Sequence, residues 1–321
     1  MSNNICKDRV TSLNLKPKMT VNELVNEMGK SGSFGAGRLA TAVDIYERML
    51  KEHATIFLGL SGAMTPAGFR GVITDLIKRG MVNAVVSTGA NMVHDALEAF
   101  GGVHYKGTWL IDDKTLHEYE VDRIYDIFIP EAVFVTKFDK PIFKILRDIA
   151  KHHGGKTMGI KDFMWEIGKR MPPDEKSILY NAYKYKVPVF IPAVQDSCFG
   201  LSMWEYLFKL EEKGITVDAF KDMNDFFDML TKAKTRGAIL IGGGVPKNFI
   251  FQAAFKTGAS YDYAIQFTMD RPEPGGLSGA TLEEAVSWGK VGEKARKVQV
   301  ISDATICLPI LIAAVMERFE K

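Results

Sequence analysis

The sequence predicts an α/β fold in which a parallel β-sheet carries helices on both faces. Short, nearly uninterrupted apolar segments recur along the chain, as is typical of parallel strands that are buried on both sides. Segments with helical spacing separate them, and small or polar residues follow the C-terminal end of each apolar segment. Because strand–helix–strand units form right-handed crossovers, we expect these segments to build one doubly covered sheet.

The first strand–helix unit begins at residues 54–60 (ATIFLGL), which fit a buried strand. The SGAM turn follows, and we expect Thr65 to be the N-cap and Pro66 the first residue of a helix. We expect this helix to end at Gly80, because glycine readily adopts the left-handed conformation that follows a helix.

Four further strands are predicted, and small or polar residues follow each of them. They are residues 82–88 (VNAVVST), 187–194 (VPVFIPAV), 237–242 (GAILIG) and 297–302 (KVQVIS). After the first of these we expect a helix from about His94 to Phe100. Ligands of open α/β sheets bind beyond the carboxyl ends of the strands. The first candidate ligand contacts are therefore the residues at these ends, Thr88, Asp196, Gly242 to Gly244 and Asp303.

The sequence is expected to form one large domain, residues 1–321, because it shows no internal repeat and no linker. Hydrophobic residues make up 46% of the chain, which is enough for a large core and excludes a disordered protein. Two segments fit the strand–helix pattern poorly. We expect residues 1–33 to be an N-terminal arm and residues 104–135 to be a peripheral insertion.

Charge and cysteine content narrow the classes of function. The net charge is +2, and no block of lysine or arginine appears, so we expect no nucleic-acid partner. No apolar segment is long enough to predict a membrane span, and the polar start lacks the pattern of a signal peptide. The widely spaced cysteines Cys6, Cys198 and Cys307 favour the reducing cytoplasm, and no cysteine or histidine spacing predicts a metal site.

The segment GGGVPKN (242–248) lies between a predicted strand and a predicted helix. Glycines there allow a backbone to approach a phosphate group, and a helix N-terminus attracts one. The segment is not G-x-G-x-x-G, so nucleotide binding and a simple tight turn are equally open. No G-x-S-x-G segment occurs, which disfavours a serine hydrolase.

The segment SGATLEEAVSWGK (278–290) is the most informative one. Thr281 and Glu284 have the spacing of a capping box, which gives Glu284 an ordinary structural explanation. Glu284 and Trp288 share a helix face, and the following glycine ends the helix just before Lys290. Lys290 is then a solvated lysine at a helix C-terminus, a cation held by Trp288 and Glu284, or a partly desolvated nucleophile.

The run EAVSWGK (284–290) is similar to the active-site signature of the deoxyhypusine synthase family, in particular its divergent, prokaryote-type branch. The order of the other segments agrees with this resemblance: STGAN, VPVFIPAVQD, GGGVPKN, LSGATLEEAVSWGKV and SDATICLPIL. The resemblance extends from about Phe34 to the C-terminus and covers nearly the whole chain.

The resemblance implies a Rossmann-like fold that binds NAD, and a homotetramer with active sites at subunit interfaces. It also implies transfer of the aminobutyl part of spermidine, a polyamine, to a lysine of a translation factor. Lys290 matches the lysine that forms the covalent imine, Trp288 and Glu284 match polyamine contacts, and Asn248 replaces a histidine of the substrate site. The residues that match NAD contacts are Thr88, Gly89, Ala90, Asp196, Gly242, Gly243, Asp303 and Ala304.

The substrate end departs from the typical eukaryotic pattern. Leu201 and Leu277 stand where those proteins have aspartates, and His94 stands where they have a glutamate. Because a buried ammonium group without a counter-charge is costly, we expect weaker or redirected polyamine binding unless Asp270 or Glu273 supplies the charge.

Three functions are therefore considered. The first is NAD-dependent transfer of the 4-aminobutyl group of spermidine, through an imine on Lys290, to the translation-factor lysine. The second keeps this chemistry but uses a small amine acceptor, as in homospermidine synthesis, or a different polyamine donor. The third is a non-catalytic NAD-binding homologue. The intact EAVSWGK run favours the first function.

Overall fold

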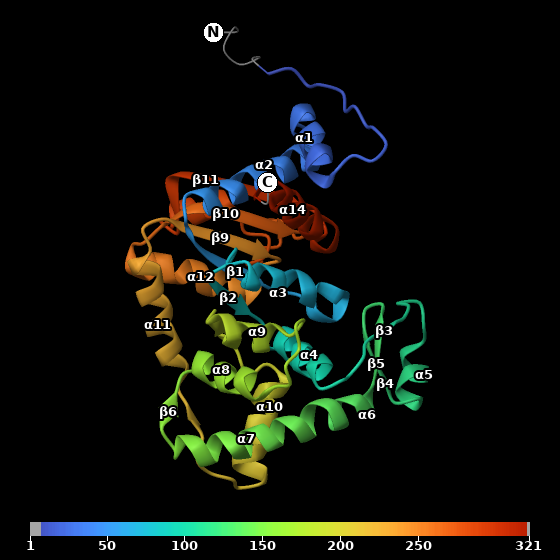
Figure 1. Cartoon of the computed structure of the whole chain (residues 1–321), viewed down its shortest axis with the longest axis vertical. Helices are drawn as coiled ribbons and strands as arrows, with labels where there is room; N and C mark the ends of the chain where they lie inside the picture. The colour runs from blue at the N-terminus through green and yellow to red at the C-terminus, as the bar shows by residue number, and fades with distance from the viewer. Residues whose placement is uncertain (1–7, 320–321) are drawn as a thin grey trace. The chain divides into compact units, whose positions relative to one another are not determined.

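Six strands form the main sheet of the computed structural model, which describes residues 8–319 (Figure 1). The strand order is β11-β10-β9-β1-β2-β7. Strand β10 is parallel to both β9 and β11, and β2 is parallel to β7. The predicted α/β fold with a parallel sheet is therefore confirmed.

The elements have the following bounds. The strands of the main sheet are β1 (Thr55–Leu60), β2 (Ala84–Ser87), β7 (Val189–Phe190), β9 (Arg236–Ile241), β10 (Tyr261–Thr268) and β11 (Val291–Ile301). The shorter strands are β3 (Tyr105–Lys106), β4 (Val121–Ile124), β5 (Ile127–Pro130), β6 (Thr157–Met158) and β8 (Thr216–Val217). The α-helices are α1 (Val21–Ser31), α2 (Phe34–Lys51), α3 (Arg70–Lys78), α4 (Gly89–Ala99), α5 (Asp113–Glu118), α6 (Glu131–Phe134), α7 (Lys140–His153), α8 (Ile160–Arg170), α9 (Ile178–Tyr185), α10 (Cys198–Trp204), α11 (Ala219–Lys232), α12 (Gly244–Thr257), α13 (Leu282–Ser287) and α14 (Ala304–Phe319). Three π-helical segments are η2 (Thr65–Phe69), η3 (Val135–Asp139) and η4 (Glu205–Lys209).

The described chain divides into two compact units. The first contains the residues up to Gly59 and from Leu230 on, and the second contains Leu60–Met229. The organisation into one domain that the sequence favours stays a prediction. Among the described residues, no helix is both long and apolar enough to cross a bilayer.

In the first unit, helices cover both faces of the strands. A methyl group at Gly237 of β9 would lie 2.8 Å from the sulfur of Met49, so this face of β9 packs against α2. Side chains alternate along a strand, so Leu240 points to the other face. There Leu240 and Ile250 of α12 both lie against Gly59 of β1. The core of this unit is therefore built on both sides of β9.

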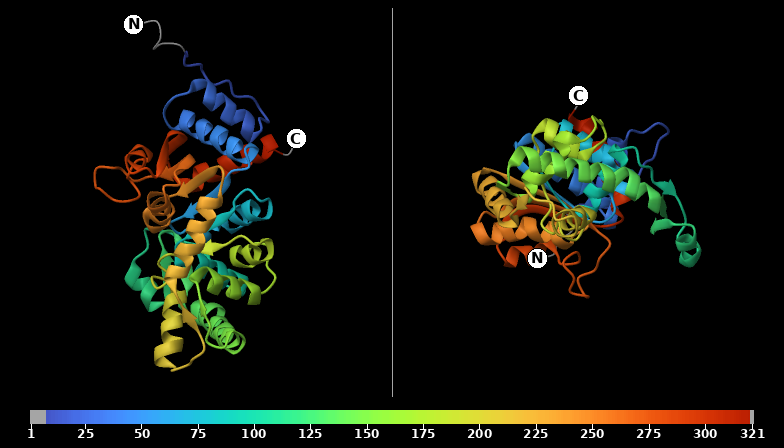
Figure 2. Two further views of the ribbon diagram at one scale, coloured as in Figure 1. Left: turned by 90° about the vertical axis from the view of Figure 1, so that its left-hand side faces the viewer. Right: turned by 90° about the horizontal axis from the view of Figure 1, so that it is seen from below.

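In the second unit, the segment expected to be an insertion has a small sheet of its own. Strands β3, β5 and β4 form this antiparallel sheet in that order, and α5 lies between β3 and β4 in the chain. Figure 2 shows the segment in green as a separate lobe of this unit. Tyr105 of β3 and Tyr125, in the turn between β4 and β5, are both exposed, so part of its surface is not covered within the unit.

The start of α4 differs from the prediction. The helix begins at Gly89 rather than near His94, because Asn91 anchors its first turn. The Asn91 side chain accepts a hydrogen bond from the Thr65 N–H (3.0 Å) and donates one to the Gly62 carbonyl (2.9 Å). Thr65 is also not an N-cap, since Met64 occupies that position before η2. The small residues after β2 thus form a helix because of a tertiary contact that the local sequence does not show.

Strand β10 was not predicted, although it lies between β9 and β11. Asp262 and Gln266 interrupt its apolar pattern. Both have partners: Asp262 accepts a hydrogen bond from the Arg236 N–H (2.8 Å), and Gln266 donates to the carbonyls of Gly242 and Ser278 (both 2.9 Å). Asp262 is exposed, and the buried Gln266 has its partners, so both residues are compatible with a central strand.

Candidate functional site

Lys290 lies on the turn between α13 and β11, and hydrogen bonds fix its backbone on both sides. Its N–H donates to the Ala285 carbonyl (3.0 Å), and its carbonyl accepts from the Tyr261 N–H (3.0 Å). Gly289 adopts a φ of 66°, which ends the helix at the predicted position. The Lys290 Nζ lies 5.2 Å from the centre of the Trp288 ring, within the range of a cation–π contact.

Helix α13 orients the groups that accompany Lys290. Thr281 is its N-cap and accepts a hydrogen bond from the Glu284 N–H (3.0 Å), so the predicted N-cap is confirmed. The reciprocal half of the predicted capping box, a bond from the Thr281 N–H to the Glu284 side chain, is not found for this described helix. The Trp288 ring lies edge-on to Phe255 of α12, with 5.8 Å between the ring centres. The indole is therefore held from one side by α12 while 55% of the residue stays exposed. This leaves Trp288 available to an incoming ligand.

A small pocket in the first unit joins the predicted catalytic and substrate-binding residues. Its volume is about 60 Å³, enough for a few water-sized groups. Lys290, Trp288, Glu284 and Asn248 all line it. The other residues in its wall are Lys247, Phe251, Leu277, Ala280, Thr281 and Ala285. The structure thus brings together four side chains that lie as far apart as 248 and 290 in the sequence.

Lys247 is a member of this pocket that the sequence analysis missed. Its side chain is buried, and its Nζ donates to Oε1 of Gln266 (3.1 Å) and to the carbonyls of Leu277 (3.1 Å) and Ala280 (2.5 Å). Burial lowers the pKa of Lys247 to about 8, the nearby carboxylate of Glu284 raises it, and Lys290 lowers it further. Three oxygen acceptors still hold an ammonium there near neutral pH. In the sequence, the feature that points to Lys247 is its position within GGGVPKN, in the first turn of a helix that follows a buried strand.

The glycine turn after β9 has the geometry that its sequence predicts. Gly242 and Gly244 have φ values of 72° and 55°, and α12 begins at Gly244. A methyl group at Gly243 would lie 2.3 Å from the Cα of Ser278, so only glycine fits. Asp303 caps the neighbouring helix α14 by accepting from the Thr305 N–H (2.7 Å), with Ala304 as its first residue. Two helix N-termini of the first unit therefore carry the residues that match NAD contacts.

The other residues that match NAD contacts lie in the second unit. Thr88 is the N-cap of α4, and Gly89 and Ala90 form its first turn. Asp196 lies in an exposed turn before α10, and its N–H donates to the Ala193 carbonyl (3.0 Å). A methyl group at Gly89 would lie 2.4 Å from the Ser197 hydroxyl. The two segments are therefore in contact within this unit.

The leucines that replace family aspartates have different surroundings. Leu277 lines the Lys290 pocket and is half exposed. Leu201 lies on α10 of the second unit and is 60% exposed. Neither Asp270 nor Glu273 is among the described residues that line the Lys290 pocket. Among the described residues that line this pocket, Glu284 is the only one with a carboxylate, and it is the glutamate that the family resemblance implied.

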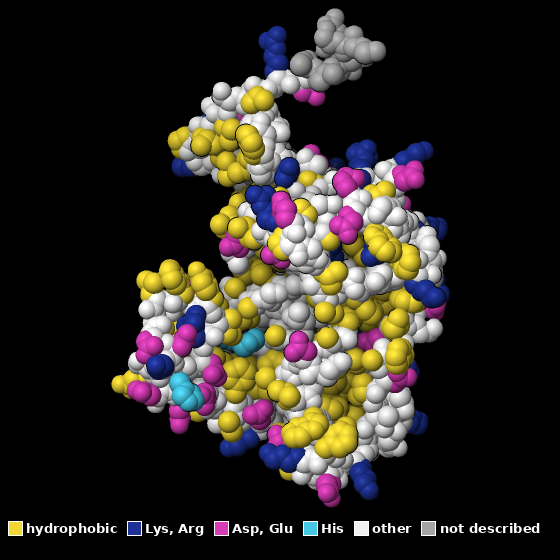
Figure 3. Space-filling model, turned by 180° about the vertical axis from the view of Figure 1, so that it is seen from behind, with side chains coloured by type: hydrophobic (Ala, Val, Ile, Leu, Met, Phe, Trp, Pro, Cys, Tyr) yellow, Lys and Arg dark blue, Asp and Glu magenta, His cyan; other side chains and the backbone are white. Residues whose placement is uncertain are grey.

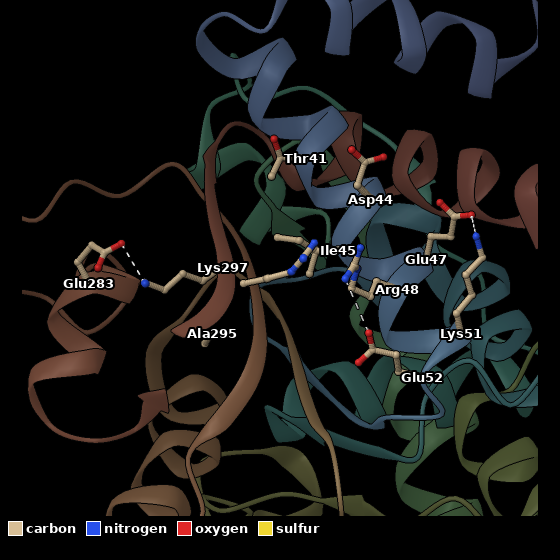
Figure 4. A pocket seen from close by; sticks show the side chains of 11 residues that line it. Thr41, Asp44, Ile45, Glu47, Arg48, Lys51, Glu52, Glu283, Ala295 and Lys297 are labelled. Atoms are coloured by element: carbon tan, nitrogen blue, oxygen red, sulfur yellow. Dashed lines mark hydrogen bonds and ion pairs between the residues drawn. The ribbon is translucent and has the colours of Figure 1, made fainter. Parts of the chain in front are cut away.

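A larger groove in the first unit contains none of the predicted site residues. Its volume is about 940 Å³, and α2 faces β11 and α13 across it (Figure 4). Many charged side chains of the groove form ion pairs: Lys51 pairs with Glu47, and Lys297 pairs with Glu283 (3.3 Å). Because these charges neutralise one another, the groove shows no preference for an anion or a cation.

The comparisons with known proteins decide the family. A family model described as "Deoxyhypusine synthase" matches residues 23–315. The chain belongs to the deoxyhypusine synthase family. This confirms the resemblance that EAVSWGK and the surrounding segments indicated.

Relatives from archaea agree with the family model. "Probable deoxyhypusine synthase 1" of Methanosarcina acetivorans is 49% identical over 97% of this chain and 96% of that protein. "Probable deoxyhypusine synthase 1" of Archaeoglobus fulgidus is 41% identical over 97% of this chain and 98% of that protein. A solved structure described as "putative deoxyhypusine synthase from Entamoeba histolytica" shares the fold, with a TM-score of 0.65 and 17% identity over 92% of this chain and 93% of the other.

The family membership gives the chain its enzyme class. It is an aminobutyl transferase of hypusine biosynthesis, as predicted from the sequence. Dependence on NAD is a general property of the family.

Proposed function

We propose that this chain transfers the 4-aminobutyl group of spermidine to a lysine of a translation factor through an imine on Lys290. The observation that carries the proposal is the pocket that joins Lys290 with Trp288, Glu284 and Asn248. A lysine beside an indole and a carboxylate suits a reaction in which an amine attacks an electrophilic carbon next to a cationic substrate.

The pocket residues have separable roles in this mechanism. The Lys290 amine attacks the carbon of the donor imine, and the carbon–nitrogen bond to propane-1,3-diamine then breaks, so that the diamine leaves with the bonding pair and a proton. The acceptor lysine amine displaces Lys290 in the same way. Trp288 lies along the cationic chain, and Glu284 supplies the opposite charge. Lys290 is regenerated at the end of each cycle.

The residues at the helix N-termini fit a dinucleotide, and we propose that they hold NAD. The supporting observation is the glycine turn at the N-terminus of α12, since the N–H groups at a helix N-terminus can bind a pyrophosphate. Gly242, Gly243, Asp303 and Ala304 are the proposed contacts in the first unit. Thr88, Gly89, Ala90 and Asp196 are those in the second. When bound there, NAD would supply reversible hydride transfer at the carbon beside the secondary amine.

We further propose a homotetramer that acts in the cytoplasm. The Lys290 pocket has room for only part of a polyamine, so a neighbouring copy can complete it. The second unit also has an exposed apolar stripe on α10 and η4, formed by Leu201, Trp204 and Phe208 at helical spacing. Figure 3 shows that hydrophobic side chains gather over the lower part of the molecule in that view. The cysteines Cys198 and Cys307 are free, which suits a reducing compartment, and Cys6 lies outside the described residues.

Borohydride trapping tests the proposed mechanism. Purified protein is incubated with NAD and spermidine, reduced with borohydride and digested with a protease. The mass of the peptide that carries Lys290 is then measured by mass spectrometry. We expect an aminobutyl adduct on Lys290, none in Lys290→Ala, and normal labelling in Lys294→Ala, where the exposed neighbour Lys294 is removed instead. An unmodified Lys290 peptide from protein that binds NAD would contradict the mechanism. Adducts from another amine but not from spermidine would reassign the donor.

A further inference from the structure

A groove in the second unit has a strongly basic wall, which comes mostly from α7. The volume of this α7 groove is about 920 Å³. Five cations and one carboxylate line it: Lys140, Lys144, Arg147, Lys151, Arg170 and Asp148. Four of the cations lie at helical spacing along α7 and form one stripe about 17 Å long. Arg170 pairs with Asp148, so the unpaired positive charge of the groove lies on this stripe.

Three lysines of the stripe are free to bind a partner. Lys140, Lys144 and Lys151 are exposed, and none of them has an ion-pair partner among the described residues. Arg147, which lies between them on α7, pairs with Glu212 (3.1 Å). Like charges one helical turn apart repel each other. A partner with carboxylates would therefore relieve this repulsion when it binds.

Apolar side chains form the rest of the α7 groove. They belong to Phe100, Pro141, Ile145, Met171 and Pro172. Ile145 and Met171 are buried, so they form a packed floor beneath the lysines. An aromatic side chain gains free energy when it covers such a floor, whereas a phosphate backbone does not. The groove thus fits an acidic protein segment with exposed aromatic rings better than it fits a nucleic acid.

The lobe of β3, α5, β4 and β5 has the complementary charge. Its residues 112–126 contain six carboxylates and two cations, a net charge of −4. Glu118, Glu120 and Asp126 are exposed, and in the described part of the chain no cation pairs with them. Figure 3 shows acidic side chains in magenta over this lobe, at the left of that view. Since these carboxylates do not pair with the groove lysines of their own copy, both sets are available to a second copy.

Exposed tyrosines accompany the carboxylates of the lobe. Tyr119 lies between Glu118 and Glu120 in the chain and is 75% exposed. Tyr125 directly precedes Asp126 and is 66% exposed. Tyrosine combines a large apolar ring with a polar tip, which suits a groove that has an apolar floor and a charged rim. The lobe therefore matches the α7 groove in charge and in apolar surface.

We infer that the lobe of one copy binds in the α7 groove of a second copy, and the inference rests on the homotetramer proposed above, of which this is one interface. Figure 1 shows the lobe at one end of the helical run from α6 through η3 to α7. Two copies that run in opposite directions place the lobe of each over α7 of the other, so a two-fold axis makes the contact twice. Because exposed charges are screened by salt, added salt weakens this association.

Charge reversal tests the interface by sedimentation velocity of the full chain. The groove variant combines Lys140→Glu with Lys144→Glu, and the lobe variant combines Glu118→Lys with Glu120→Lys. Each variant alone should associate about a hundred-fold more weakly and sediment as a smaller species, because like charges then face one another. An equimolar mixture of the two variants should regain the natural sedimentation. In the mixture, the reversed groove faces the reversed lobe, and the natural groove faces the natural lobe.

A matched control reverses two lysines outside the groove. Lys156→Glu with Lys176→Glu changes exposed lysines of the same unit and should leave the sedimentation unchanged. Natural sedimentation of the groove variant or the lobe variant alone would overturn the inference and leave the groove to an acidic segment of another protein. A folded mixture that does not reassemble would overturn it as well. A monomeric natural protein would overturn both the inference and the homotetramer, whereas an unlabelled Lys290 counts against the proposed chemistry alone.

Discussion

Replacing Lys247 by methionine tests whether the Lys290 pocket contains a buried, titrating ammonium. The natural side chain is held by Gln266 and by the carbonyls of Leu277 and Ala280. Burial lowers its pKa from the usual 10.5 of a lysine to about 8. Between these two values the unfolded chain binds more protons than the native protein, so stability rises with pH there. Below about pH 8 both states are protonated, and the penalty of the buried charge is at its full value.

The size of the effect follows from the two pKa values. Between pH 7 and pH 10, the free energy of unfolding of the natural protein should rise by about 2.5 kcal/mol relative to Lys247→Met, which has no group to titrate there. We would measure urea unfolding of both proteins by tryptophan fluorescence at fixed salt. Lys294→Met, at an exposed position, should follow the natural protein throughout. The reasoning is refuted if the difference between the natural protein and Lys247→Met does not change with pH.

Two further changes test the pocket and the glycine turn. Trp288→Ala should raise the spermidine concentration needed for half-maximal labelling of Lys290 about ten-fold, because the cation–π contact and the apolar cover of the polyamine are lost. Trp288→Phe should restore part of the lost affinity, because it keeps an aromatic ring. Equal labelling curves for Trp288→Ala and the natural protein would contradict this role. Gly243→Ala should weaken NAD binding measured by calorimetry, because a methyl group 2.3 Å from the Ser278 Cα forces the turn before α12 to shift. Gly276→Ala has open space and should bind normally. Normal NAD binding by Gly243→Ala would show that the turn does not approach the cofactor.

The site could be predicted from sequence where its geometry is local. The N-cap at Thr281 and the left-handed Gly289 fix the placement of Trp288 and Lys290 within a single short segment. The role of Lys247 could not be predicted, because its acceptors come from residues that lie far along the chain. The same reason explains α4, whose first turn depends on contacts of Asn91 with the turn after β1. Short-range patterns indicate strands and caps, whereas the partners of buried polar groups depend on the whole fold.

The contact between Gly243 and Ser278 gives the two halves of the proposed site a common wall. Gly243 belongs to the turn proposed for NAD, while Ser278 follows Leu277 of the amine pocket and is held by Gln266 and Thr268. A ligand that displaces Gly243 or Ser278 must therefore displace the other of these two residues as well. Leu277 is half exposed, so its side chain can be replaced without disturbing the contact between Gly243 and Ser278. A larger residue at Ser278 would instead alter the affinity for both ligands. In this fold the choice of amine can therefore diverge at position 277 while the neighbouring residue stays tied to the cofactor.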